Sequence, residues 1–108
     1  MESYDKLRII MSYYGYEAQR EQYIEESSEG ILAAQKCKRY GTKECLEAFK
    51  GEIADNLIMD MQMAIFLGQY DIMNIIEDKL DRQLDRIVEI EGVEGFEKIK
   101  GDALEKQG

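Results

Sequence analysis

Four acidic side chains in the middle of the chain occur as two pairs with helical spacing. The pairs are Glu26 with Glu29 and Glu52 with Asp55, and the members of each pair are three positions apart. Residues at i and i+3 project from the same side of an α-helix, about 60° apart around its axis. If the two segments are helices that pack together, the four carboxylates face a common space. Carboxylates gathered in this way need a counter-charge, which Mg²⁺ supplies because it prefers oxygen ligands.

The composition leaves few other kinds of chemistry. The 108 residues include no histidine and two cysteines, Cys37 and Cys45, which excludes Ser-His-Asp and Cys-His nucleophiles and the common Cys/His zinc sites. We interpret both cysteines as inert free thiols and expect a cytoplasmic protein. The net charge of −9 argues against a nucleic-acid partner. The acidic N-terminus and the short apolar runs predict neither a signal peptide nor a membrane-spanning helix.

The chain is predicted to be all-α, because proline is absent and apolar residues recur with helical period between the glycines. We expect helices over about residues 4–13, 17–38, 43–67 and 71–89. Four late glycines predict a weakly structured tail over 91–108. No linker is visible, so residues 1–108 are interpreted as one domain with its core at about 13–90. We expect the four helices to form an antiparallel bundle. A domain of this size buries only about two-thirds of its unfolded surface, so we expect the four-helix antiparallel bundle to be completed by oligomerisation.

Helical stepping extends the two acidic pairs into longer stripes. One stripe comprises Gln22, Glu26, Glu29 and Ala33, and the other comprises Glu52, Asp55, Met59 and Met63. The opposite side of the helix over 43–67 is also apolar, which predicts that this helix is covered on nearly all sides and that its carboxylates lie in a partly closed groove. The alternative is an ordinary solvated helix face. Two acidic pairs on consecutive helices favour the groove.

With these motifs the sequence resembles the all-α nucleoside triphosphate pyrophosphohydrolases, specifically MazG-like proteins of the small bacterial and phage type. The signature of that superfamily, ExxE followed by ExxD, is present as Glu26-Ser-Ser-Glu29 and Glu52-Ile-Ala-Asp55, and Lys79-Leu-Asp-Arg82-Gln83 resembles its KxxRR element. Two positions depart from the family pattern. Gly30 replaces a large aliphatic residue and is expected to loosen its helix by about 1 kcal/mol. Gln83 replaces the second arginine and removes a potential phosphate contact.

The resemblance implies hydrolysis of a nucleoside triphosphate to the monophosphate and pyrophosphate, by attack of water at the α-phosphorus. The Mg²⁺ ligands that it implies by position are Glu26, Glu29, Glu52 and Asp55. One of these, or Glu25, would orient the attacking water. Lys79 and Arg82 would contact phosphate oxygens, arginine through its bidentate fork and lysine as a point charge. Family members are bundles with sites at subunit interfaces, so a homodimer or homotetramer is expected.

Other polar residues near the acidic pairs are weaker candidates. Gln19 and Gln22 lie upstream of Glu26 and are candidates for hydrogen bonds to a base edge, with a polar helix surface as the alternative. Asn56 is a candidate for the hydrogen-bond shell of the site. Lys36, Lys38 and Arg39 are candidates to attract a triphosphate, although we favour the interpretation that they are charges at a helix terminus. The alternative function is a non-catalytic helical interaction or regulatory module that keeps the scaffold.

Overall fold

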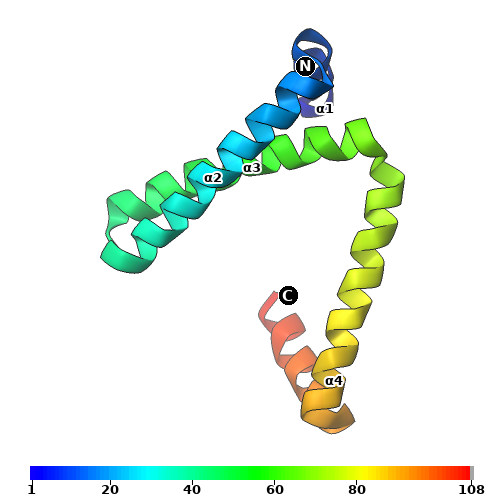
Figure 1. Ribbon diagram of the computed structural model, residues 1–108. Coiled ribbons are helices and arrows are strands. Elements are labelled where there is room, and N and C mark those ends of the chain that lie inside the picture. The colour runs from blue at the N-terminus through cyan, green and yellow to red at the C-terminus, as the bar shows by residue number, and fades with distance from the viewer. Residues whose placement is uncertain (108) are drawn as a thin grey trace. The chain divides into compact units, whose positions relative to one another are not determined.

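The structure is a computed structural model that describes residues 1–107, and it is helical almost throughout (Figure 1). Four helices follow one another along the chain: α1 (Ser3–Tyr14), α2 (Tyr16–Tyr40), α3 (Lys43–Leu67) and α4 (Gln69–Gln107). Residues 1–107 contain no β-strand. The prediction of an all-α protein is therefore confirmed, and α3 begins and ends at the predicted residues.

The turn between α2 and α3 consists of two residues that suit a helix end and a helix start. Gly41 adopts the left-handed conformation (φ 60°, ψ 20°), and its N–H donates to Cys37 O at 2.9 Å. Thr42 caps α3, because its hydroxyl oxygen accepts a hydrogen bond of 3.2 Å from the Cys45 N–H. These caps satisfy backbone groups that the ends of both helices leave without partners. The chain can therefore turn back on itself directly after α2.

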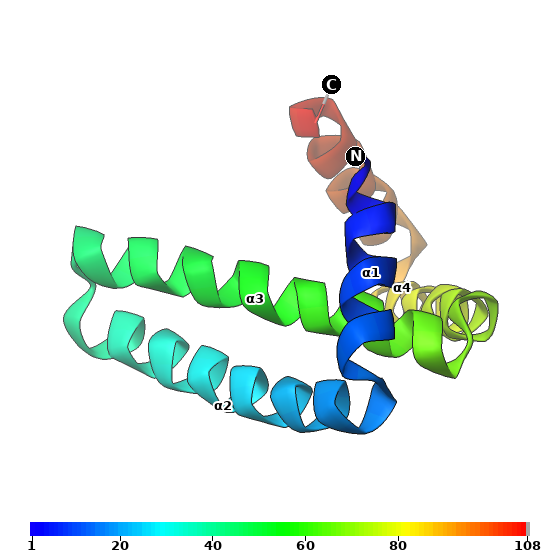
Figure 2. The same ribbon diagram turned by 90° about the horizontal axis from the view of Figure 1, so that it is seen from above.

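The two long helices α2 and α3 form an antiparallel hairpin, and α1 crosses one end of it (Figure 1 and Figure 2). The buried apolar side chains belong to this part of the molecule: Leu7 and Met11 on α1, and Met59 and Met63 on α3. Burial of a side chain of this size stabilises a fold by about 1.5–3 kcal/mol. The small core thus lies where α1 packs on the hairpin. The rest of the hairpin depends on contacts between α2 and α3.

Two glutamines are buried together in the hairpin. Gln62 is 1% exposed and Gln19 is 6% exposed. The Nε2 of Gln19 donates to Gln62 Oε1 at 2.8 Å, and Gln62 Nε2 in turn lies 3.7 Å from the Met59 sulfur. Gln19 therefore links α2 to α3, whereas its sequence suggested a base-edge donor or a surface residue.

The outer side of α3 is exposed, which corrects the prediction that this helix is covered on nearly all sides. Ile53, Leu57 and Met61 are 43%, 55% and 47% exposed, although their spacing indicated a second buried side. In a hairpin, a helix buries only the stripe that faces its partner. The apolar residues on the other side of α3 remain in solvent within the single chain.

The chain divides into two compact units after Gln69. Residues 1–69 form the first unit, and the second unit contains α4 from Tyr70 onwards. Gly92 has a non-helical conformation (φ 78°, ψ 167°) and divides α4 into two helical segments. The second segment is helical to Gln107, which corrects the prediction of a weakly structured tail over 91–107. The prediction for Gly108 lies outside the described residues. Gly95 and Gly101 lower helix propensity by about 1 kcal/mol each, and the helix-forming residues around them outweigh this.

None of the helices within residues 1–107 is both long and apolar enough to cross a lipid bilayer.

Candidate metal centre

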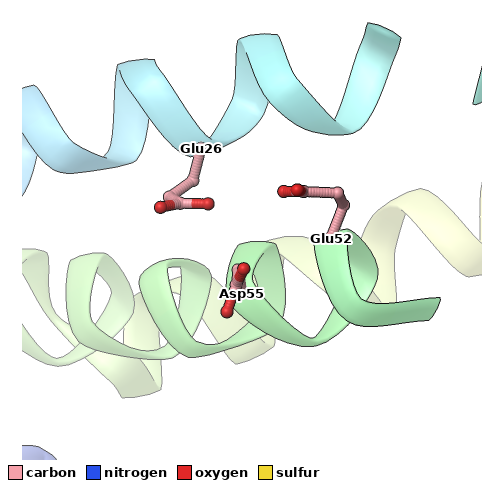
Figure 3. Close-up of side chains that lie close together, drawn as sticks. All are labelled: Glu26, Glu52 and Asp55. Atoms are coloured by element: carbon pink, nitrogen blue, oxygen red, sulfur yellow. The ribbon is translucent and has the colours of Figure 1, made fainter. Parts of the chain in front are cut away.

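Carboxylates from α2 and α3 converge in the middle of the hairpin. Glu26 projects from α2, and Glu52 and Asp55 project from consecutive turns of α3 (Figure 3). One oxygen of each carboxylate lies within 4.8 Å of the other two. We call these three residues the carboxylate cluster. The i,i+3 spacing of Glu52 and Asp55 places both on one side of α3, and the two-residue turn brings α2 alongside them.

Two oxygens of the carboxylate cluster are buried without a hydrogen-bond donor. They are Glu26 Oε2 and Glu52 Oε2. The other oxygen of Glu26 accepts a hydrogen bond of 2.9 Å from Gln22 Nε2. A buried carboxylate oxygen without a partner is costly, and a bound cation removes this cost. Asp55 is exposed, so the carboxylate cluster is open to solvent on that side.

Glu29 lies at the edge of the carboxylate cluster and is exposed. Its pKa is raised from the ordinary value of 4.5, first by the charge of Glu26 and then by partial loss of hydration. The charges of three further acids add to this rise: Glu52, Glu25 and Asp55. Five acidic side chains therefore share one region of negative potential. Glu29 is not among the three whose oxygens lie closest together.

The donor set fits a hard divalent cation. All three members of the carboxylate cluster offer oxygen atoms. Among residues 1–105, whose side chains the structure describes, the ion pairs are Arg20–Glu21 and Lys50–Glu47, which do not involve the cluster. A carboxylate-rich oxygen site with room for water is characteristic of Mg²⁺. Glu26, Glu52 and Asp55 are the residues that would hold such an ion.

A groove on the hairpin adjoins the carboxylate cluster. It has a volume of about 350 Å³, and Glu29 and Glu52 form part of its wall. The other lining residues are mostly apolar and include one cation: Leu32, Ala33, Lys36, Glu44, Cys45 and Ala48. The sequence left open whether Lys36 attracts a triphosphate or is only a charge at a helix terminus, and the structure places it in the same groove as Glu29 and Glu52. The signal for this place was its spacing of seven residues from Glu29, which puts both on one side of α2.

The remaining predicted site residues fall into three groups. Gln22 contacts Glu26 directly, and Glu25 is exposed on the neighbouring position of α2. Asn56 faces α2 from α3, and its Nδ2 donates to Glu52 O at 2.8 Å. Lys79 and Arg82 lie in the second unit.

On α4, Lys79 and Arg82 are exposed and line a hollow of about 200 Å³. Gln83 and Arg86 complete its wall. Sequence reasoning did not name Arg86, although its spacing of four residues from Arg82 places both on one side of the helix. The three cations make no ion pair within the part of the chain that the structure describes.

Gly30 lies within α2 at the point where this helix faces Asn56 of α3. The helix is continuous from Tyr16 to Tyr40, and a Cβ on Gly30 would overlap with Asn56 Nδ2. The glycine therefore allows the asparagine of α3 to approach α2.

In comparisons with known proteins, no family model, no curated protein sequence and no solved structure matches this chain.

Proposed function

We propose that the protein is a Mg²⁺-dependent nucleoside triphosphate pyrophosphohydrolase, which converts a (d)NTP and water to the (d)NMP and pyrophosphate. The observation that carries this proposal is the convergence of Glu26 with Glu52 and Asp55, whose oxygens lie within 4.8 Å of one another. These residues belong to the ExxE and ExxD motifs, which resemble those of the MazG-like proteins. The motifs support the reaction, and the convergence supports a binding place for the cation.

Each residue around the carboxylate cluster has a proposed part in the hydrolysis. When bound, Mg²⁺ polarises a phosphoryl oxygen and makes water a better nucleophile. Gln22 holds one oxygen of Glu26, so that the other stays directed towards α3. Glu29 is named as a ligand by the resemblance, and its exposed carboxylate at the edge of the carboxylate cluster is also a candidate to accept the proton of the attacking water. Glu25 is the other candidate for this role.

The groove beside the carboxylate cluster is the proposed place for the substrate. Lys36 would attract the phosphates of an anionic ligand to an otherwise acidic region. The resemblance alone supports Lys79 and Arg82 as further phosphate contacts. Changing Lys36 to methionine should therefore raise KM by about tenfold and change kcat less, because it weakens the binding of substrate and transition state alike.

The test of this function is the release of pyrophosphate from a panel of NTPs and dNTPs in the presence of Mg²⁺. Glu52→Gln and Asp55→Asn should each lower the rate by on the order of a hundredfold, or about 2.7 kcal/mol of activation free energy. Glu47→Gln and Asp60→Asn are matched controls on α3 outside the carboxylate cluster and should keep the rate. Release of orthophosphate instead, or full activity in both cluster variants, would remove the proposal.

We also propose that the protein is a homodimer or homotetramer. The exposed apolar side chains on α2 and α3 support this, among them Ile31, Leu32 and Leu57. Light scattering during size-exclusion chromatography measures the mass directly. Self-association without Mg²⁺-dependent nucleotide binding would favour the alternative, a non-catalytic interaction module.

A further inference from the structure

Gly30 and Asn56 meet across the interface between α2 and α3. Gly30 lies one helical turn after Glu26, and Asn56 lies one turn after Glu52. A Cβ on Gly30 would overlap with Asn56 Nδ2 and would lie 3.4 Å from Asn56 Cγ. The absence of a side chain at Gly30 thus provides the space that the asparagine amide occupies.

The amide of Asn56 is held in place by its own helix. Its Nδ2 donates to the backbone oxygen of Glu52 at 2.8 Å, and its side chain is half-buried. The hydrogen bond joins Asn56 to a residue that carries one carboxylate of the cluster. The Asn56 amide therefore occupies the space between α3 and the backbone of α2 at Gly30.

We propose that Asn56 is a positioning residue, whose amide against Gly30 sets the distance and rotation of α2 relative to α3, so that Glu26 and Glu52 direct their oxygens into one space. The Asn56 amide is held by its hydrogen bond to Glu52 O, so we expect a methyl group at position 30 to displace the amide from this bond and to move the two helices apart. Residues that orient metal ligands typically change metal affinity by 10–100-fold. The consequence for Mg²⁺ rests on the proposed function, whereas the spacing of the helices does not.

The first test is calorimetric titration of the full chain with Mg²⁺. In Gly30→Ala the new methyl group displaces the amide, and we expect the Kd to rise by about tenfold. In the double variant Gly30→Ala/Asn56→Ala the amide is absent and the methyl group has room, so the Kd should return to within about threefold of the wild type. The Kd of Asn56→Ala alone should lie between those of the wild type and Gly30→Ala.

Gly51→Ala is the matched control, because a Cβ there meets nothing within 4 Å and the gain in helix propensity is the same. Its Kd should equal that of the wild type. An unchanged Kd in Gly30→Ala would overturn the positioning role. So would a double variant whose loss of Mg²⁺-binding free energy is the sum of the losses in the two single variants.

Crystal structures of the metal-free variants test the spacing independently of function. The distance between the Cα atoms of Glu26 and Glu52 should increase by about 0.5 Å or more in Gly30→Ala and return in the double variant. If the wild type binds no Mg²⁺ and this pattern holds, the proposed function is wrong and the positioning role stands. If the distance is unchanged in Gly30→Ala, the positioning role is wrong even where Mg²⁺ binds.

Discussion

The interface between α2 and α3 contains two polar layers that differ in how their hydrogen bonds are satisfied. In the glutamine layer, Gln19 and Gln62 are bonded to each other at 2.8 Å and have almost no exposure. In the carboxylate cluster, Glu26 and Glu52 each bury an oxygen that has no donor. The first layer has its hydrogen bond within the chain, whereas the second leaves two buried carboxylate oxygens that a cation would satisfy. One pair of helices therefore combines a structural tie with a candidate binding site.

The difference follows from the chemistry of the two side chains. An amide has both donors and an acceptor, so two glutamines can satisfy each other. Ionised carboxylates only accept hydrogen bonds and repel one another, so bringing them together lowers stability unless something positive lies between them. Four changes of conditions or sequence should separate the two layers.

Addition of Mg²⁺ should have the largest effect. A ligand that binds only the folded state raises the free energy of unfolding by about 2.7 kcal/mol when its free concentration is a hundred times Kd. Urea unfolding with Mg²⁺ and with EDTA measures this gain. Gln19→Leu should keep the gain and Glu52→Gln should lose it; a gain that persists in Glu52→Gln would place the ion elsewhere.

Disruption of the glutamine layer should lower stability in a way that Mg²⁺ does not alter. Gln19→Leu leaves Gln62 buried without its partner, which costs about 1–3 kcal/mol. The double variant Gln19→Leu/Gln62→Leu removes both polar groups and should recover part of the loss. Urea unfolding of the three proteins checks this, and an equal or greater loss in the double variant would contradict it.

In the metal-free protein, Glu52→Gln should raise the free energy of unfolding by about 0.5 kcal/mol, because it removes one of several like charges. Glu47→Gln is the matched control, since it breaks an exposed ion pair of 3.1 Å with Lys50. The control should show a change of a few tenths of a kcal/mol or less in the opposite direction. A loss of stability in Glu52→Gln would mean that its carboxylate has a partner within the chain.

The metal-free protein should lose a small part of its stability as the pH rises through the raised pKa of Glu29. The folded state binds this proton more tightly than the unfolded chain, where the carboxyl titrates at about 4.5. The contribution is therefore present below pH 4.5 and is lost as the pH rises through the higher folded-state value. Urea unfolding in EDTA at several pH values measures it.

Glu29→Gln should remove this pH dependence, and saturating Mg²⁺ should suppress it in the wild type. Glu21→Gln, also on α2, is the control and should keep the dependence. The same slope in Glu29→Gln as in the wild type would show that another group is responsible.

Much of the fold was predictable because it depends on local signals. The absence of proline and the apolar period between the glycines predicted α2 and α3, and α3 has the predicted bounds. The acidic pairs could be placed on facing stripes, because i,i+3 spacing needs no knowledge of tertiary structure. That reasoning named Glu26, Glu52 and Asp55.

Features that depend on contacts across the interface were not predictable. The burial of Gln19 and Gln62 depends on how α2 and α3 pack against each other, whereas glutamine on a helix usually lies at the surface. The contact between Gly30 and Asn56 was not predictable either, because it arises only from the separation of α2 and α3. The exposure of Leu57 was also missed, since apolar periodicity indicates which side is to be buried and not what covers it.

The two-residue turn at Gly41 and Thr42 has a consequence for folding kinetics. Every member of the carboxylate cluster belongs to consecutive helices, so the site is assembled by closing one short stretch of chain. The contacts next to the turn have low sequence separation and form early, since little chain entropy is lost before they are made, and the contacts farther along the hairpin follow from them. The carboxylate cluster should therefore reach its final arrangement before any site assembled from distant parts of the chain, and a fragment ending at Gln69 should still contain it.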